Sequence, residues 1–371
     1  MFPLNLYQRK FVLMFSSTIS LKDIFYYFRR IVIKTGSWEY WPMWAVYFPV
    51  SFYYAYLSFK ARSFFFFSAS NPSIENGGMF FESKWKIFQL MPKEYYPATI
   101  LIDPNDTISN ITDKMKVAAI QYPVIAKPDR GERGWMVKKI HSPEEMEAYR
   151  NTVHISFLIQ EYIDYPLEFS IFYYRHPNSN KGHISSVTYK QLLSITGDGI
   201  SDMDTLIRKQ DRSFLQYKRL KKELNINLDQ VLDKGEEKLL VPYGNHVLGT
   251  RFVNCNHLID QQLTDTFDTI SKKIEGFYFG RFDLRCRSIG ELKQNTHISI
   301  LELNGAGAEP AHIYNPGFSF IEAQKVLASH YKMMFDAAIE NKKKGFEFMC
   351  FRSFIQLKKE EKKYKQNLQL L

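Results

Sequence analysis

The spacing of hydrophobic and polar residues alternates along the chain between helical and strand-like patterns. Amphipathic spacing predicts helices at residues 22–34, 82–90, 108–119, 263–274 and 320–338, and Ser142-Pro143 opens another helix as cap and first turn. Short apolar runs predict strands at residues 63–69, 98–102, 122–127, 135–140, 157–162, 168–174, 280–286 and 298–303. The elements mix without a strict strand–helix–strand rhythm, so we expect an α+β fold rather than a doubly wound sheet.

An uncharged aromatic segment, WPMWAVYFPVSFYYAYLSF, covers residues 41–59. It is long enough to cross a membrane, but Pro42 and Pro49 interrupt it and Trp and Tyr prefer the membrane interface. The favoured interpretation is a helix or hairpin that packs its aromatics into a core. A peripheral membrane contact is the second interpretation and a true span the third. The basic residues that support the second are Arg29, Arg30, Lys34, Lys60 and Arg62.

Composition narrows the class of protein. The 371 residues are 45% hydrophobic, which excludes a mainly disordered chain. Three cysteines without a CxxC pair exclude a disulfide framework and fit a reducing, cytoplasmic compartment. The net charge of +10 is compatible with nucleic acid, an anionic membrane or a phosphate-rich ligand. The basic excess at the C-terminus is most typical of a solvated helix or tail, and no nucleic-acid motif accompanies it.

The common signatures of nucleotide and hydrolytic chemistry are absent from the sequence. It contains no GxxxxGK[ST] phosphate loop, no GxGxxG fingerprint, no HExxH metal motif and no GxSxG elbow. Any chemistry must therefore come from a less compact arrangement of residues.

One candidate is the stretch PVIAKPDRGERGWMVK at residues 123–138. Lys127 closes a buried strand, Gly131 and Gly134 lie in the following loop, and Lys138 lies on the next strand. A lysine at a strand end suits phosphate oxygens, and glycines let backbone N–H groups approach a polyphosphate. An exposed hairpin with ordinary lysines explains the same residues equally well.

Further candidates follow on later strands. The segment 160–163 (QEYI) can present backbone groups to an adenine, and Glu168 can accept from ribose hydroxyls. Two more strands, GRFDLR and ILELNG, carry Asp283, Glu302 and Asn304, and the last two share a face by period-two alternation. Two carboxylates and an amide oxygen suit Mg²⁺. The alternative is that Asp283 is ion-paired with a neighbouring arginine, Arg281 or Arg285.

Taken in order, these motifs resemble the ATP-grasp superfamily, in the branch of D-alanine–D-alanine ligases and cyanophycin synthetases. The resemblance covers roughly residues 84–338, and the segment 196–207 (TGDGISDMDTLI) resembles a cyanophycin synthetase motif. It implies an ATP-grasp fold, two α+β subdomains that grip ATP. The aromatic-rich N-terminal region departs from the family's usual leader domain, and so does GAGAEPAHIYNPG after ELN, where the acceptor would bind.

The resemblance also implies roles for individual residues. Nucleotide-binding residues would be Lys84 or Lys86, Lys127, Gly131, Gly134, Lys138, Gln160, Glu161, Tyr162, Ile163 and Glu168. Metal ligands for Mg²⁺ or Mn²⁺ would be Asp283, Glu302 and Asn304. Arg281 would stabilise a developing oxyanion, and Lys190 with Arg212 or Arg251 would contact the γ-phosphate.

We therefore expect an ATP-dependent carboxylate–amine ligase that works through an acyl phosphate. Its substrates would be a small carboxylate and an amine, amino acid or peptide-like, and a homodimer and a peripheral contact with the inner face of the membrane are compatible with it. The alternatives are an ATP-grasp enzyme with a kinase-like or carboxylate–thiol outcome, and an inactive nucleotide-binding scaffold. The expected domains are an aromatic-rich region at 1–98, an ATP-grasp domain at 99–345 and a basic helix or tail at 346–371.

Overall fold

The computed structural model describes residues 21–132, 134–223, 227–242 and 244–369. The chain divides into two compact units, Met1–Tyr47 with Ile195–Glu236 and Phe48–Ser194 with Glu237–Leu371. The three domains expected from the sequence stay predictions, and the first twenty residues of the N-terminal one lie outside the described residues.

The first unit is built from helices that come from distant parts of the sequence. They are α2 (Leu21–Gly36), η1 (Trp38–Tyr40), α7 (Met203–Lys209) and α8 (Asp211–Glu223). The guanidinium of Arg29 on α2 donates to the Arg208 carbonyl at 2.7 Å and to the Asp211 carboxylate at 2.6 Å. An ion pair of 2.6 Å joins Arg212 to Glu39, and both side chains are nearly buried. The helix expected at 22–34 is confirmed.

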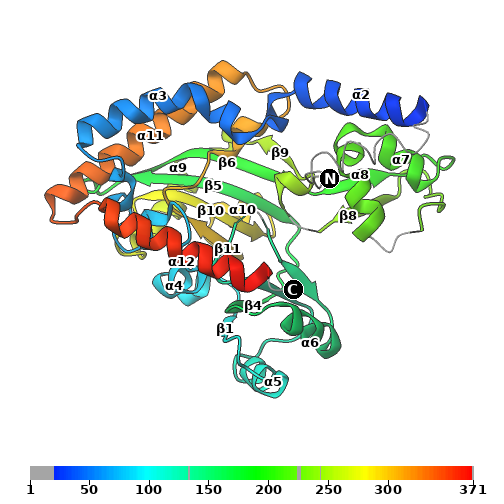
Figure 1. Ribbon diagram of the computed structural model, residues 1–371, viewed down its shortest axis with the longest axis horizontal. Coiled ribbons are helices and arrows are strands. Elements are labelled where there is room, and N and C mark those ends of the chain that lie inside the picture. The colour runs from blue at the N-terminus through cyan, green and yellow to red at the C-terminus, as the bar shows by residue number, and fades with distance from the viewer. Residues whose placement is uncertain (1–20, 133, 224–226, 243, 370–371) are drawn as a thin grey trace, which may run out of the picture. The chain divides into compact units, whose positions relative to one another are not determined.

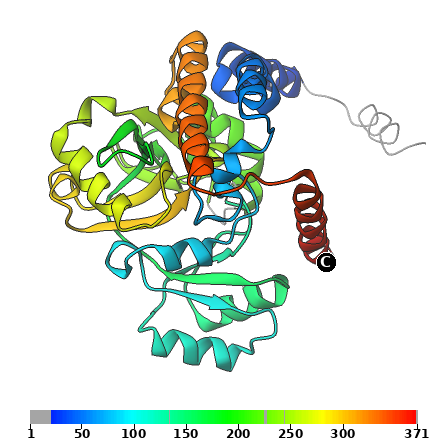
Figure 2. The ribbon, with the colours of Figure 1, turned by 90° about the vertical axis from the view of Figure 1, so that its left-hand side faces the viewer.

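The second unit contains a four-stranded antiparallel sheet in the order β1-β4-β2-β3. Its strands are β1 (Thr99–Ile102), β2 (Val124–Pro128), β3 (Lys138–Ile140) and β4 (Phe157–Glu161). Helices α5 (Ile108–Val117) and α6 (Pro143–Thr152) cover one face of this sheet and bury Ile111 and Met146 against it (Figure 2). Thr107 and Ser142 cap the two helices by accepting from backbone N–H groups of the first turn, as their sequence positions suggest. The strand predicted at residues 135–140 is confirmed only from Lys138 onward.

A five-stranded antiparallel sheet forms the rest of the core of this unit, in the order β11-β10-β5-β6-β9. Its strands are β5 (Leu167–Arg175), β6 (Gly182–Gln191), β9 (Arg251–Asn254), β10 (Phe279–Cys286) and β11 (Ile298–Asn304). Helices α9 (Gln261–Lys272) and α10 (Ile289–Lys293) bury apolar side chains against one face, including Phe267 packed on Phe282. Helix α11 (Phe320–Lys343) packs against aromatic side chains of the opposite face, such as Phe172 and Phe279 (Figure 1). The α+β prediction is confirmed.

The aromatic segment forms one helix, α3 (Met43–Ala61), which packs against α11 through contacts such as Tyr54 with Tyr331. The strand expected at 63–69 is wrong, because residues Phe66–Ala69 form the 3-10 helix η2. Phe66 and Phe67 are both buried in the cluster around α11, whereas a strand would send neighbouring side chains to opposite faces. The backbone bonds here are local, for instance from Ser70 N to Phe67 O.

The basic C-terminal segment is a helix, α12 (Phe351–Gln369), whose described side chains are mostly exposed but which makes aromatic contacts with the rest of the unit. The Phe354 ring lies 4.9 Å from that of Phe65, and the Tyr364 ring lies 5.4 Å from that of Phe81. Because the Tyr364 hydroxyl also accepts from the backbone N–H of Arg130 at 3.3 Å, α12 contacts the loop that follows β2.

The remaining elements are short. They are η3 (Glu75–Gly78), α4 (Lys84–Leu90), η4 (Lys93–Tyr95), β7 (Leu193–Thr196), β8 (Glu237–Val241), η5 (His246–Leu248), η6 (Asn256–Leu258) and η7 (Ala311–Tyr314). In the part of the chain that the structure describes, no helix combines the length and apolar character needed to cross a bilayer.

Candidate functional site

Charged residues gather on one face of the five-stranded sheet because β10 alternates with period two. Phe282, Leu284 and Cys286 point into the core beneath α9. The intervening residues Arg281, Asp283 and Arg285 therefore share the opposite face. Neighbouring strands add further polar residues to that face, since Glu168 is the register partner of Arg285, and Ser170 that of Asp283.

A β-bulge in β11 decides which side chains of that strand join them. Asp283 pairs with Glu302, but Leu284 pairs with Ile300, so Leu301 is an extra residue without a partner on β10. The extra residue lets Ile300 and Leu303 both enter the core while Glu302 lies opposite Asp283. The freed carbonyl of Leu301 accepts a hydrogen bond of 2.9 Å from Lys127 Nζ.

Lys84, in the first turn of α4, also lies beside Glu302. The Ser83 side chain caps this helix by accepting from Lys86 N, and donates to the Asp129 carboxylate at 2.9 Å. Asp129 directly follows β2, so α4 is attached to the end of the strand that carries Lys127. Lys84 Nζ lies 3.6 Å from Glu302 Oε1 and 2.5 Å from the Gly131 carbonyl. Of the two lysines expected to bind the nucleotide, Lys84 therefore lies in the charged cluster, whereas Lys86 is exposed and pairs with Glu75.

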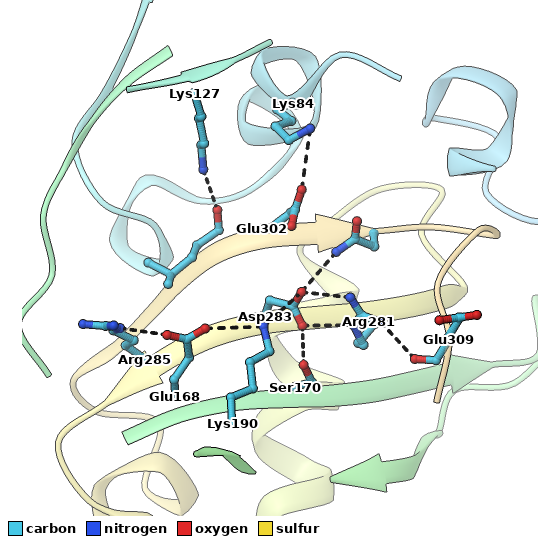
Figure 3. A network of polar contacts seen from close by, with 12 residues as sticks. Lys84, Lys127, Glu168, Ser170, Lys190, Arg281, Asp283, Arg285, Glu302 and Glu309 are labelled. Atoms are coloured by element: carbon cyan, nitrogen blue, oxygen red, sulfur yellow. Dashed lines mark hydrogen bonds and ion pairs between the residues drawn. The ribbon is translucent and has the colours of Figure 1, made fainter. Parts of the chain in front are cut away.

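An ion-pair network connects the acids and bases of the site (Figure 3). Arg281 binds Asp283 through two nitrogens, at 2.9 and 3.0 Å, and Lys190 Nζ lies 3.4 Å from the same carboxylate. Lys190 also lies 3.4 Å from Glu168, which Arg285 contacts at 3.1 Å. The alternative interpretation that Asp283 is ion-paired with Arg281 thus describes an actual contact, one that coexists with the expected ligand cluster.

Most of these charged groups are less than a tenth exposed, namely Lys127, Glu168, Lys190, Asp283 and Arg285. Buried charges are costly unless they are paired, so their mutual contacts are what make the cluster stable. Together with Lys84, Arg281 and Glu302, the cluster has five cationic side chains and three carboxylates. Two further carboxylates lie within electrostatic reach of these cations, Glu82 near Lys84 and Glu309 near Arg281, so the site mixes both signs of charge.

Burial also changes the protonation of individual groups. Burial lowers the pKa of Lys127 to about 8, with Glu302 opposing this shift and Lys84 adding to it. Burial alone would raise the pKa of Asp283, but Arg281, Lys190 and the bond from Ser170 hold it well below its usual range. Asp283 is therefore ionised, whereas Lys127 loses its proton at a lower pH than an ordinary lysine does.

The remaining residues with an expected nucleotide role lie around the network with varied exposure. Gln160 is buried and accepts from Lys127 Nζ at 2.9 Å, and the Ile163 carbonyl accepts from Arg285 at 2.9 Å. The guanidinium of Arg285 lies 5.7 Å from the centre of the Tyr162 ring. Glu161 and Lys138 are exposed.

The loop after β2 brings its glycines close to other backbone and side-chain groups. Gly131 and Gly134 both have positive φ, 144° and 70°, which glycine adopts readily. A Cβ on Gly134 would lie 2.8 Å from the Asn245 side-chain nitrogen. Arg133, between them, lies outside the described residues.

Two arginines expected near a γ-phosphate are not part of the network. Arg212 belongs to the first unit, where Glu39 pairs with it. Arg251 is exposed at the start of β9. Its register partner is Gln191, whereas Lys190 of the network pairs with Phe252.

Three polar residues of the site were not among the sequence candidates. Arg285 could have been found, because it lies two residues from Asp283 on the same strand and so shares its face. Ser170 gave no signal of its own. Glu82, just before α4, carries a buried carboxylate oxygen without a hydrogen-bond partner in the described chain, and burial, with Glu302 nearby, raises its pKa.

A cavity of 480 Å³ opens beside the network. Among its lining residues are Tyr162, Glu168, Tyr189, Lys190 and Arg285. Gly244 approaches this wall so closely that a Cβ there would lie 1.9 Å from Glu168 Oε1 and 2.8 Å from Lys190 Cδ. The site thus combines a partly open cavity with a charged edge, a combination that suits a small polar ligand.

The residues expected to bind a metal fit Mg²⁺ by their donor chemistry. Asp283 and Glu302 are cross-strand partners, and Asn304 Nδ2 lies 3.4 Å from Asp283 Oδ2 on the same face. These are hard oxygen donors of the kind that Mg²⁺ prefers. Within the described residues, no group of three or more His, Cys, Asp or Glu side chains is arranged to hold a metal ion, so the amide of Asn304 would have to complete this set.

Comparison with known proteins gives structural likenesses alone. No protein-family model and no curated protein matches the chain. Similar solved structures include a bifunctional glutathione synthetase from Pasteurella multocida, at 12% identity, 68% of this chain, 35% of that chain and a TM-score of 0.34. The D-alanine–D-alanine ligase from Bacillus anthracis matches at 12% identity over 70% of this chain and 66% of that chain, with a TM-score of 0.38. VanG D-Ala:D-Ser ligase from Enterococcus faecalis matches at 12% identity over 72% of this chain and 62% of that chain, with a TM-score of 0.40.

The chain thus spans about a third to two thirds of the length of these structures. All three are ATP-grasp enzymes, the superfamily that the sequence motifs resemble. Because the TM-scores are below 0.5, we base the proposed function on the side chains of the site.

Proposed function

We propose that the chain is an ATP-dependent ligase that joins a small carboxylate to an amine. The observation that carries the proposal is the cluster of five cationic side chains and three carboxylates, formed where one face of the five-stranded sheet meets Lys127 of β2 and Lys84 of α4. Clustered cationic side chains suit the oxygens of a polyphosphate, and acids that alternate with the cations suit a phosphate–metal complex better than a simple anion.

In this proposal the two sheets supply different parts of an ATP site. Lys84 and Lys127 neutralise phosphate oxygens, and the loop with Gly131 and Gly134 lies over them. The backbone of residues 160–163 contacts the adenine, and Glu168 accepts from the ribose hydroxyls. The space for the nucleoside is the 480 Å³ cavity that Tyr162 and Glu168 line.

Asp283, Glu302 and Asn304 would hold Mg²⁺ or Mn²⁺, whose charge would neutralise phosphate oxygens when the metal is bound. A ligand bound there must share Asp283 with Arg281 and Lys190, which contact it now. Glu302 is more accessible, because about a third of its side chain is exposed (35%).

The proposed reaction has two steps. The substrate carboxylate attacks the γ-phosphorus of ATP, so ADP leaves and an acyl phosphate forms. The amine then attacks the acyl carbon, loses a proton, and expels phosphate, which leaves an amide. In this proposal Arg281 would stabilise the negative charge that develops on the acyl oxygen, and Lys190 would contact the transferred phosphoryl group. Roles for Lys86, Lys138, Arg212 and Arg251 stay predictions.

The finer expectations are proposals as well. We propose an amino acid or peptide-like substrate pair, a cytoplasmic location, and a homodimer as the state to test first. We also propose a peripheral membrane contact through the N-terminal region.

The test is an assay of ADP release with Mg-ATP and pools of amino acids and short peptides. We expect ADP with at least one pool, accompanied by an amide product. In Glu302→Ala we expect turnover to fall by about a hundredfold or more while the thermal unfolding curve is retained. Glu322→Ala, which removes an exposed carboxylate at the start of α11, is the matched control and should keep full activity.

The outcomes separate the competing functions. A phosphorylated or thioester product in place of an amide would favour a kinase-like or carboxylate–thiol enzyme. Binding of Mg-ATP without ADP release from any pool would favour an inactive scaffold. Full activity of Glu302→Ala would contradict the metal-ligand assignment.

A further inference from the structure

Helix α3 is apolar on both sides, although the residues that the structure describes cover only one of them. On the inner side, Val46, Val50, Leu57 and Ala61 are each less than a tenth exposed. Leu57 and Ala61 belong to the core cluster shared with α11, beside which α3 lies in Figure 1. A helix that is hydrophobic all round is normally buried all round, so the outer side of α3 needs an explanation.

The outer side carries a continuous row of large aromatic residues. Their exposed fractions are 75% for Trp44, 61% for Phe48, 66% for Phe52, 53% for Tyr56 and 83% for Phe59. The spacing of three or four residues keeps all five on one helical face over most of the length of α3. We call these five residues the aromatic face of α3. Soluble proteins seldom expose an apolar patch of this extent unless something binds to it.

The charged residues of the sequence segment that contains α3 are all of one sign. From residue 40 to residue 74 the sequence has no Asp or Glu, and its charged residues are Lys60 and Arg62. Both are exposed at the end of α3. Lys60 Nζ also lies 5.7 Å from the centre of the Tyr56 ring, so positive charge is placed directly beside the face.

We propose that the aromatic face of α3 docks on an anionic lipid membrane, with the helix lying in the interface and not across it. Trp and Tyr are the side chains that favour the membrane–water interface, and Phe supplies buried apolar area. Exposed basic residues without neighbouring acids complement anionic headgroups. A protein partner would need acidic groups to match Lys60 and Arg62, and the face itself offers almost no polar contacts to direct one. This inference is independent of the ligase reaction.

The experiment is co-sedimentation of the full-length protein with vesicles of phosphatidylcholine, with and without phosphatidylglycerol. We expect binding that depends on phosphatidylglycerol and weakens with salt. Phe52→Ser combined with Phe59→Ser should lower the partition coefficient by about tenfold or more. Lys60→Gln combined with Arg62→Gln should weaken binding to anionic vesicles by a smaller factor.

The matched control is Val117→Ser with Phe351→Ser, which removes two equally exposed apolar side chains (90% and 66%) elsewhere in the same unit. It should bind vesicles like the unmodified protein. A second readout is the blue shift of tryptophan emission on vesicle binding, which Trp44→Phe should reduce.

Three results would overturn the inference. Absence of vesicle binding would exclude a membrane as the occupant, and equal binding to neutral vesicles would exclude the role of the basic residues. If sedimentation velocity instead shows a dimer that dissociates in the Phe52/Phe59 variant, the face contacts a second copy of the chain. ADP release is measured without vesicles, so a failed ligase assay leaves this test unaffected.

Discussion

Nucleotide binding should weaken as Lys127 loses its proton, because the proposed function needs this amine as a phosphate partner. Burial lowers its pKa from 10.5 to about 8 in the ligand-free protein. That shift corresponds to about 3 kcal/mol of disfavour for the charged amine. A polyphosphate beside Lys127 would supply the missing negative charge and raise the pKa again, so binding would be coupled to proton uptake.

The expected size of the effect follows from the fraction of protein that is already protonated. With a pKa of about 8, Lys127 is charged in about nine tenths of the molecules at about pH 7 and in about one tenth at about pH 9. If only the charged form binds, the apparent Kd for Mg-ATP should rise about tenfold across this range.

The assay is isothermal titration of Mg-ATP at several pH values in two buffers of different ionisation enthalpy. The unmodified protein should show the alkaline loss of affinity and a proton uptake that grows as the pH approaches the pKa of Lys127. Lys127→Arg should bind with little pH dependence, since a guanidinium stays charged throughout. Circular dichroism of this variant confirms that the longer side chain is accommodated.

The free energy of unfolding should rise with pH over the range in which nucleotide binding weakens. The folded protein releases the Lys127 proton near pH 8, whereas the unfolded chain holds it to about pH 10.5, so folding is favoured as pH rises through this window. Relative to Lys127→Met, the unmodified protein should gain up to about 3 kcal/mol between these two values. A flat Kd in the unmodified protein, or the same alkaline loss in Lys127→Arg, would refute this account of the buried amine.

Three further predictions concern single contacts. Asn71→Ala removes a fully buried amide that makes four hydrogen bonds to the backbone. It should lower the free energy of unfolding, measured in urea titrations, by about 3 kcal/mol or more, and a loss below about 1 kcal/mol would contradict this. Tyr364→Phe removes the hydroxyl that accepts from Arg130 N. It should lower the free energy of unfolding by about 1 kcal/mol and speed proteolysis of the loop after β2. Unchanged proteolysis would mean that α12 does not restrain this loop. Gly244→Ala forces a methyl group against Glu168, and should weaken Mg-ATP binding in the same titration more than Gly36→Ala weakens it, because a Cβ on Gly36 would meet no heavy atom within 4 Å.

Period-two alternation in the sequence was enough to place part of the site. On β10 the apolar residues alternate with Arg281, Asp283 and Arg285, and the strand forms as that pattern predicts. The same rule put Glu302 and Asn304 on one face, where they lie beside Asp283. Local rules of this kind hold because they depend on the geometry of a single strand.

Longer-range features could not be read from the pattern. Simple alternation would put Ile300 on the face of Glu302, and only the bulge at Leu301 separates them. The choice of Lys84 over Lys86 depends on how Asp129 attaches α4 to the end of β2. The SFFFFSA run at 63–69 reads as a strand, but it forms a 3-10 turn because its aromatics pack together against α11.

The sequence by itself determined many of the elements and the kinds of chemical group they carry, because periodicity, caps and turn residues act over a few neighbouring positions. The tertiary structure decided which charges meet. Arg212 and Arg251 looked interchangeable as phosphate partners, yet one pairs with Glu39 in the first unit and the other lies exposed on an edge strand. Sequence separation carries no information about such contacts, since ion pairs depend on distance through space and on burial, both of which are set only when the sheets and helices pack.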